Sequence, residues 1–385
     1  MAVPLLSPTL PTAAPQAISA TAYLGAVANQ ADVIISSMLA DFPAHRPGTR
    51  PIHAPGLAVT GWFQASTVAD IHSEAEHFSG GRVPVTVRFS NGTGVADEPD
   101  ATRTVRGMAL RFHLGEVTTD AAGMHGSTVA TDLISMTLPV FFTRTIDDFL
   151  GLTRSAVPTV AKPRTRWRNV RGAVDGIVGT LRLLPPPKGA TPADLAVVAF
   201  ADRHPPARLG IAASTLLPVP ASYATCCYHA VHAFRLTAGD RVTSVRFHWE
   251  PVAGVRPAPP GTTGNYLHEE LAQRLQRGSA DFVLRVQVAE AGDDTTDPTT
   301  PWSQARRKVV MGQLHLDAVV ADQELGCEAL RFDPTRMVPG IDVGDDPILA
   351  ARREVYGRSA DRRSSERDGA ATGAAASCPI GEPVS

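Results

Sequence analysis

The feature that most constrains the fold is a series of short segments, from about residue 57 to residue 142, that are apolar or alternate apolar with polar residues. Glycine-rich turns separate them. Several short strands at such spacing are typical of an antiparallel barrel or sandwich. The expected strands are Leu57–Gln64, Val83–Phe89, Gly107–Leu114, Asp132–Phe142, 223–236, 243–252, Phe282–Glu290 and Val309–Val319.

Helices are expected around this β-structure, at 17–41, 145–161, 163–184 and 263–278. A last helix should begin at Pro347, because proline suits the first helical position and Asp346 can cap the helix. It should run through Tyr356. After Arg363 the chain turns to Ser, Gly, Ala and Glu, which is typical of disorder. The expected parts are therefore an N-terminal arm and helix at 1–44, one large domain at 45–365 and a disordered tail at 366–385.

The charge balance argues against a nucleic-acid partner. The chain has 36 basic and 38 acidic residues, a net charge of −2. A dedicated nucleic-acid binder needs a basic excess to displace counterions. With 43% hydrophobic and 19% charged residues, the composition is that of a globular protein.

The sequence predicts a cytoplasmic protein without a membrane partner. It contains no run of 18 apolar residues that could cross a bilayer. No Lys or Arg precedes Arg46, so the positive start of a secretory signal is missing. Four cysteines without a CxxC spacing favour a reducing compartment over a disulfide framework.

Three short motifs could carry chemistry. Arg352 and Tyr356 are four residues apart on the expected last helix and share a face, where the guanidinium would favour a phenolate, a ligand for ferric iron. An ordinary Arg–Tyr contact explains the same spacing. His53, just before a strand, could be a general base or a structural loop histidine. Arg88 and Ser90 point to one face of a strand, either into a barrel that holds a polar ligand or toward solvent.

Together these motifs resemble the haem catalase family, and most closely its short catalase-related haem peroxidases. The resemblance runs from about Thr49 to Arg363. The matching segments, in the family's order, are Arg50–His53, Val87–Ser90, Arg106–Phe112, Asp132–Leu133, Pro139–Phe142 and Val338–Tyr356. The resemblance implies an α+β fold with an antiparallel β-barrel core, surrounding helices, and haem b bound within 45–365.

The resemblance also implies roles for individual residues. His53 matches the distal histidine that moves a proton of the bound peroxide, and Ser90 matches the serine that holds its ring. Tyr356 matches the axial ligand of the haem iron, and Arg352 matches the arginine that keeps this tyrosine ionised. The remaining matches, all to residues around the haem, are Arg50, Arg88 and Arg363 at the propionates, Phe141 and Phe149 on the haem faces, and His232 on the proximal side.

Two departures from the family affect the expected activity. Met136 takes the place of the distal asparagine, so an amide donor is replaced by an apolar thioether. This should weaken hydrogen peroxide dismutation and suit organic hydroperoxides. The chain also stops soon after the proximal helix, so the C-terminal helical domain of full-length catalases is expected to be absent, and NADPH is not predicted.

The expected function is that of a haem-dependent peroxidase with weak catalase activity, which cleaves organic hydroperoxides or hydrogen peroxide and takes electrons from a small-molecule donor. Two alternatives stay open: a hydroperoxide-rearranging or tailoring haem enzyme of the same fold, and a non-catalytic haem-binding protein. The sequence names neither the donor nor the peroxide, and it leaves a homo-oligomer open.

Overall fold

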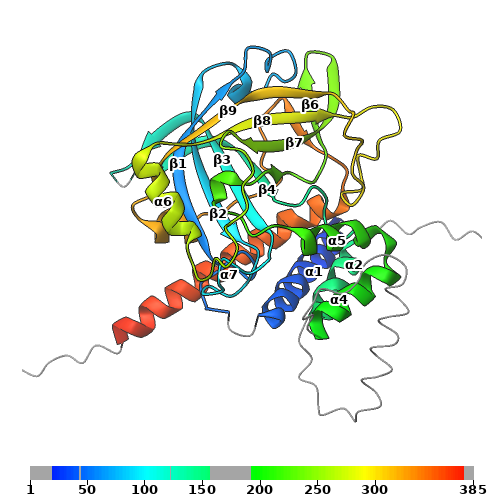
Figure 1. Cartoon of the computed structure of the whole chain (residues 1–385), viewed down its shortest axis with the longest axis vertical. Helices are drawn as coiled ribbons and strands as arrows, with labels where there is room; N and C mark the ends of the chain where they lie inside the picture. The colour runs from blue at the N-terminus through cyan, green and yellow to red at the C-terminus, as the bar shows by residue number, and fades with distance from the viewer. Residues whose placement is uncertain (1–19, 43–44, 122, 157–191, 377–385) are drawn as a thin grey trace, which may run out of the picture.

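The computed structural model describes residues 20–42, 45–121, 123–156 and 192–376 (Figure 1). Its strands are β1 (Gly56–Ala65), β2 (Arg82–Asn91), β3 (Arg106–Thr119), β4 (His125–Met136), β5 (Tyr228–His229), β6 (Phe234–Ala238), β7 (Arg241–Pro251), β8 (Ala280–Val288), β9 (Lys308–Val319) and β10 (Ile341–Val343). They form one antiparallel sheet in the order β10-β6-β7-β5-β4-β3-β2-β1-β9-β8. An additional pairing of β7 with β8 closes the strands from β7 to β8 into a ring.

The interior of the ring is the main hydrophobic core. Strand β8 alternates buried with half-buried residues over most of its length, which directs every second side chain inward. Aromatic rings fill the centre, and Phe63 packs edge-on against Phe112 and Trp249 at centroid distances of 5.2 and 6.2 Å. Edge-to-face pairs of this kind contribute beyond the buried area itself. The ring is therefore a packed scaffold, and a site has to lie outside its interior.

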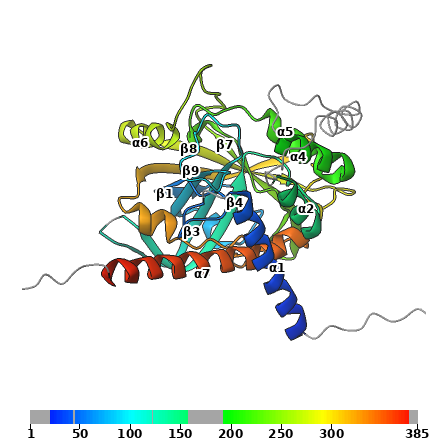
Figure 2. The same cartoon turned by 90° about the horizontal axis from the view of Figure 1, so that it is seen from below.

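Most of the described helices gather at one end and along one side of the ring: α1 (Ala20–Asp41), α2 (Ile146–Ala156), α4 (Pro192–Arg203), α5 (Arg208–Leu216) and α7 (Pro347–Ala376). Helix α6 (Leu267–Arg277) lies apart from them, against β8 and β9 (Figure 1). Figure 2 shows α7 running along the underside of the molecule, with α1 crossing it and α2, α4 and α5 grouped beside them. Within the described ranges, none of the helices combines the length and apolarity needed to span a membrane.

Most expected strands and helices are present with shifted ends. The strand expected at 132–142 begins earlier and ends at Met136, because Pro139 cannot donate to a ladder. The strand expected at 223–236 is split into a 3₁₀ turn at Tyr223–Thr225 and the short strands β5 and β6. Residues 1–16 and the helix expected at 163–184 lie outside the described residues.

The tail expected to be disordered from residue 366 differs from the structure over its first part, since α7 continues to Ala376. Contacts that the sequence does not display hold this extension. The carboxylate of Glu366 accepts hydrogen bonds from Arg362, one turn earlier, and from the backbone N–H of Gly48. Residues 377–385 are outside the described part.

Candidate active site

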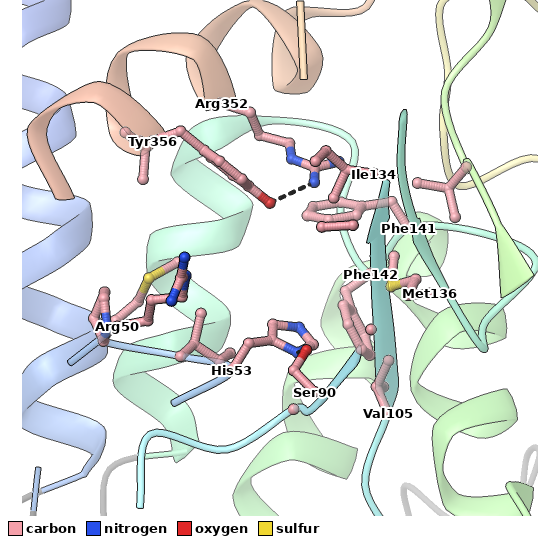
Figure 3. A pocket seen from close by; sticks show the side chains of 18 of the residues that line it. Arg50, His53, Ser90, Val105, Ile134, Met136, Phe141, Phe142, Arg352 and Tyr356 are labelled. Atoms are coloured by element: carbon pink, nitrogen blue, oxygen red, sulfur yellow. Dashed lines mark hydrogen bonds between the residues drawn. The ribbon is translucent and has the colours of Figure 1, made fainter. Parts of the chain in front are cut away.

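A cavity of about 690 Å³ lies between the ring and the helices. It collects side chains from distant parts of the sequence: the segment before β1, the ends of β2, β3 and β4, the helices α1, α2, α4 and α5, and the first half of α7. Figure 3 shows His53 and Tyr356 entering it from opposite sides.

His53 occupies one wall in an unusual backbone conformation. Its φ is +61°, the left-handed region that side-chain-bearing residues rarely adopt. Its Nδ1 atom lies 3.0 Å from the Oγ atom of Ser90 on β2. Strained residues of this kind persist only where the surroundings fix them, and they cluster at functional sites.

The register of the sheet builds the wall beside His53. Ser90 pairs with Gly107 on β3, Gly107 pairs with Met136 on β4, and Met136 pairs with His229 on β5. These four residues form one row across four strands and all face or border the cavity. Arg88 and Ser90 do share a face, as expected, but it is the outer face of the ring, where the cavity and its helices cover them.

Burial, together with the nearby charges of Arg88, Arg352 and Arg50, lowers the pKa of His53 from 6.5 to about 3. The imidazole is therefore neutral at physiological pH and can accept a proton. If its Nδ1–H donates to Ser90, the other ring nitrogen carries the free lone pair.

This shift predicts the pH dependence of any reaction that uses His53 as a base. We expect the second-order rate constant with peroxide to stay flat between about pH 5 and pH 8, because the base is already deprotonated throughout. The pKa of His53 is lower in the folded state than in the unfolded chain, so the unfolded chain binds the proton more readily. The free energy of unfolding therefore falls as the pH drops from 6.5 toward 3. Stopped-flow rates across this range test the first expectation. An inflection near pH 6.5 that belongs to His53 would contradict it.

Gly107 is a site residue that sequence reasoning missed. A Cβ atom at this position would lie 2.7 Å from Ser90 Oγ and 3.0 Å from the His53 ring. Gly56 likewise leaves room for Arg88, because a Cβ atom at position 56 would lie 2.3 Å from the guanidinium carbon of Arg88. The two glycines therefore leave the space in which the polar side chains of this wall lie.

We expect Gly107→Ala to separate His53 from Ser90 and to lower the peroxide rate about tenfold or more, with a stability loss of about 1–3 kcal/mol from overpacking. Gly81→Ala is the matched control, since a Cβ there meets nothing within 4 Å. Thermal unfolding and initial rates of both variants check the expectation. Equal rates for the two variants would show that the His53–Ser90 contact does not matter.

The opposite wall holds a chain of four polar side chains. The Arg352 guanidinium donates to the Tyr356 hydroxyl at 2.8 Å and contacts His232 Nε2 at 2.7 Å. His232 Nδ1 lies 2.5 Å from the carboxylate of Asp346. Because arginine can only donate, His232 Nε2 must accept, and its proton then resides on Nδ1 and points to Asp346. Burial lowers the pKa of His232, which agrees with a neutral ring.

Asp346 serves two purposes in this chain. Its other carboxylate oxygen accepts from the backbone N–H of Ile348 at 2.8 Å and caps α7. The sequence identified it as a helix cap alone. Its contact with His232 spans 114 positions, so no local pattern could reveal it.

Three arginines lie together at one side of the cavity. Glu328 bridges two of them, accepting from Arg50 at 3.0 Å and from Arg88 at 3.1 Å. Arg363 is buried, and its Nε atom has no hydrogen-bond partner within the described residues. Burial and the charge of Arg88 lower the pKa of Arg363 to about 10. Three guanidinium groups against one carboxylate leave a charge of +2 in this cluster.

The cluster fits the two carboxylates of a haem. A buried excess of positive charge with an unpartnered donor calls for anionic groups, and planar guanidinium groups pair well with carboxylates. Flat apolar side chains supply the remaining walls. Phe141 and Phe149 stack at 5.9 Å between centroids, and Phe142, Val105 and Ile134 also line the cavity.

The residues expected from the sequence are thus brought together. His53, Ser90, Met136, Arg50, Arg88, Phe141, Phe149, Arg352, Tyr356 and Arg363 line the cavity, and His232 lies directly behind Arg352. Sequence reasoning missed Asp346, Gly107, Glu328 and Phe142. Phe142, Gly107 and Asp346 lie within the matching segments Pro139–Phe142, Arg106–Phe112 and Val338–Tyr356, whereas Glu328 had no such signal.

Comparison with known proteins defines the class. The family model described as Catalase matches residues 9–171 and 209–368. The chain therefore belongs to the catalase family, whose members bind haem, so a haem cofactor is implied. It is 34% identical over 330 residues to a catalase-related peroxidase of Mycolicibacterium paratuberculosis, covering 84% of this chain and 92% of that protein.

Other relatives agree with this family. A catalase-related peroxidase of Synechococcus elongatus is 26% identical over 352 residues, covering 90% of this chain and 92% of the relative. Catalase-2 of Bacillus subtilis is 26% identical over 333 residues, which is 82% of this chain and 44% of that longer protein. These relatives support an oxidoreductase that acts on peroxide.

Proposed function

We propose that this protein is a peroxidase that binds haem b between His53 and Tyr356 and reduces peroxides, with weak catalase activity. The observation that supports it most is the pairing of two polar side chains on opposite walls, each held by an orienting partner: His53 by Ser90 and Tyr356 by Arg352. The three arginines at the side of the cavity would hold the propionates. A ring closed around its aromatic core, the β-barrel expected from the sequence, would keep both walls rigid.

The bound haem would supply the iron at which the peroxide O–O bond breaks. The work of the protein is to hold and move protons. Neutral His53 takes the proton from the peroxide oxygen and returns it to the leaving oxygen, which departs as water or an alcohol. Two electrons and two protons from a small-molecule donor complete the reduction, and the second peroxide oxygen is released as water.

The hydrogen-bonded series of side chains from Asp346 to Tyr356 has a different role. Arg352 places a positive charge at the phenol oxygen, which stabilises the ionised form that would ligate iron. Neutral His232 and Asp346 fix the direction of this guanidinium without cancelling its charge at the phenol. An anionic ligand raises electron density on the iron and favours O–O cleavage.

Absorption spectra of the haem-supplied protein, before and after peroxide, test this proposal. We expect a ferric spectrum of the tyrosinate type that changes when peroxide is added. A spectrum that peroxide leaves unchanged would favour the non-catalytic haem-binding protein. Failure to bind haem would contradict both.

The composition of the His53 wall favours organic hydroperoxides over hydrogen peroxide. Met136 ends β4 where the cavity begins, and Phe142 and Val105 line the same region (Figure 3). A thioether offers a second peroxide no donor, whereas an apolar wall accepts an alkyl group. The same wall suits an enzyme that rearranges a hydroperoxide. Product analysis separates the two, because reduction gives an alcohol and rearrangement gives an epoxide or ketone.

We expect Met136→Asn to raise the rate of hydrogen peroxide dismutation about tenfold, because an amide donor on the same wall as His53 can hold a second peroxide. The rate with a bulky organic hydroperoxide should fall. Oxygen release and hydroperoxide consumption measure the two rates, and Met136→Leu, which keeps the wall apolar, is the control. If Asn and Leu variants release oxygen equally, the side chain at 136 does not select the substrate.

A small-molecule electron donor and a cytoplasmic location stay predictions from the sequence, which leaves a homo-oligomer open. We also propose residues 45–365 as the haem-binding domain.

A further inference from the structure

The segment that carries His53 needs support from outside itself. Within the described residues, His53 is the one residue other than glycine with a positive φ. Such a conformation costs on the order of a kilocalorie or more per mole and persists only when its surroundings hold it. On its C-terminal side, Ala54 is tied by its N–H to Thr93 at 2.8 Å and by its carbonyl to Arg88 at 3.0 Å.

On the N-terminal side, the support comes from the part of α7 between Arg362 and Arg367. The Glu366 carboxylate accepts from the backbone N–H of Gly48 at 2.6 Å. Arg362 donates to the carbonyl of Thr49 at 2.9 Å, and Arg367 donates to the carbonyl of Gly48 at 3.1 Å. Three side chains of one helix thus hold two consecutive residues just before Arg50. We call this set, Arg362, Glu366 and Arg367 with Gly48 and Thr49, the α7 clasp.

The clasp is continuous with the arginine cluster. Arg367 also donates to the backbone carbonyl of Glu328 at 3.3 Å, and the carboxylate of Glu328 bridges Arg50 and Arg88. One network therefore reaches both the backbone that leads to His53 and the guanidinium groups at the side of the cavity.

The fit is close and shielded. Gly48 has a φ of +79°, and a Cβ there would lie 3.0 Å from Arg367. Glu366 and Arg362 are 2.6 Å apart, with side chains 29% and 21% exposed. The Glu354–Arg358 pair on the same helix, which has the same four-residue spacing, is 41% and 44% exposed. Shielding strengthens an ion pair, because solvent screens it less.

We propose that Glu366, oriented by Arg362, is a positioning residue for His53. Helix α7 carries Tyr356 on one side of the cavity and Glu366 ten residues later, about 15 Å along the helix axis. By holding Gly48 and Thr49, the clasp ties the segment of His53 to the helix of Tyr356 and fixes the separation of the two walls. This step rests on the proposed function, because it takes His53 as the group that acts on peroxide.

The test uses the full-length, haem-loaded protein and the substitution Glu366→Ala. Glu354→Ala is the matched control, since it removes an ion pair of the same spacing from the same helix without a described contact to the 45–53 segment. Two quantities are measured: hydrogen exchange of peptides that cover residues 45–53, and the second-order rate constant with hydrogen peroxide at equal haem content. Glu366→Gln, which can still accept from Gly48, is the conservative variant.

We expect Glu366→Ala to speed exchange in 45–53 about tenfold, because a hydrogen bond to a charged group is worth a tenfold change or more in an opening equilibrium. The peroxide rate should fall by about the same factor, while the haem spectrum governed by Tyr356 stays unchanged. Glu354→Ala should change neither quantity, and Glu366→Gln should fall between.

Unchanged exchange in Glu366→Ala would overturn the clasp. Faster exchange with an unchanged peroxide rate would overturn its positioning role. His53→Ala is measured beside these variants to separate failure of the positioning role from failure of the proposed function. If His53→Ala also keeps the parent peroxide rate, His53 is not the group that acts on peroxide.

Discussion

Tyr356→Phe should abolish the tyrosinate spectrum of the haem-loaded protein and lower its peroxidase rate by about two orders of magnitude or more. Phenylalanine removes the only atom that this side chain can offer to iron, and with it the negative charge that favours O–O cleavage. The change also leaves the Arg352 guanidinium without its 2.8 Å partner. Arg352 is half-buried and keeps its contact with His232, so losing this hydrogen bond should cost about 0.5–1.5 kcal/mol and lower the melting temperature.

In the Tyr356→Phe variant, the haem content should stay close to the parent value while the absorption spectrum changes. The arginines at the propionate side are untouched, so haem should still bind, with a changed ligand field. Tyr266→Phe is the control, because its hydroxyl bonds to the carbonyl of Pro220 at 2.6 Å, outside the residues that line the cavity. A Tyr356→Phe protein with the parent spectrum would show that another residue ligates the iron.

The parts of this site that the sequence predicts are those with local patterns. The four-residue spacing of Arg352 and Tyr356 places them on one helix face, and the structure joins them by a hydrogen bond. Alternation of apolar residues predicts most strands, because a buried face leaves a period of two. Arg88 and Ser90 share a face for the same reason, although alternation alone does not tell which face is covered.

The parts that the sequence does not predict depend on contacts between distant segments. Gly107 looks like any strand glycine until the register sets it opposite Ser90, with His53 against it. The α7 extension has a composition typical of disorder, and what orders it is a contact between Glu366 and Gly48, 318 positions away. Local propensity is a weak predictor where tertiary contacts decide.

The two walls of the cavity are therefore connected through helix α7. The series of four polar side chains that ends at Tyr356 begins at Asp346, which caps α7. The α7 clasp lies on the same helix beyond Tyr356. A shift of α7 along its axis would move Tyr356 and the His53 segment together. This arrangement would keep His53 at a constant distance from Tyr356, some 300 positions away in sequence.

His53→Ala should lower the rate of peroxide activation by about 10²- to 10⁴-fold, the usual contribution of a positioned general acid–base group. The loss should appear in the second-order rate constant with peroxide, while haem binding and the resting spectrum stay close to the parent, because Tyr356 and the arginines are unchanged. Among the described residues, the His53 side chain makes one hydrogen bond, to Ser90, so its removal should cost little stability. His315→Ala is the control, since His315 pairs with Asp281 at 2.8 Å and stacks on Trp62, away from the cavity. Stopped-flow spectra with hydrogen peroxide and a bulky hydroperoxide measure all three proteins, and a His53→Ala protein as fast as the control would refute the base role.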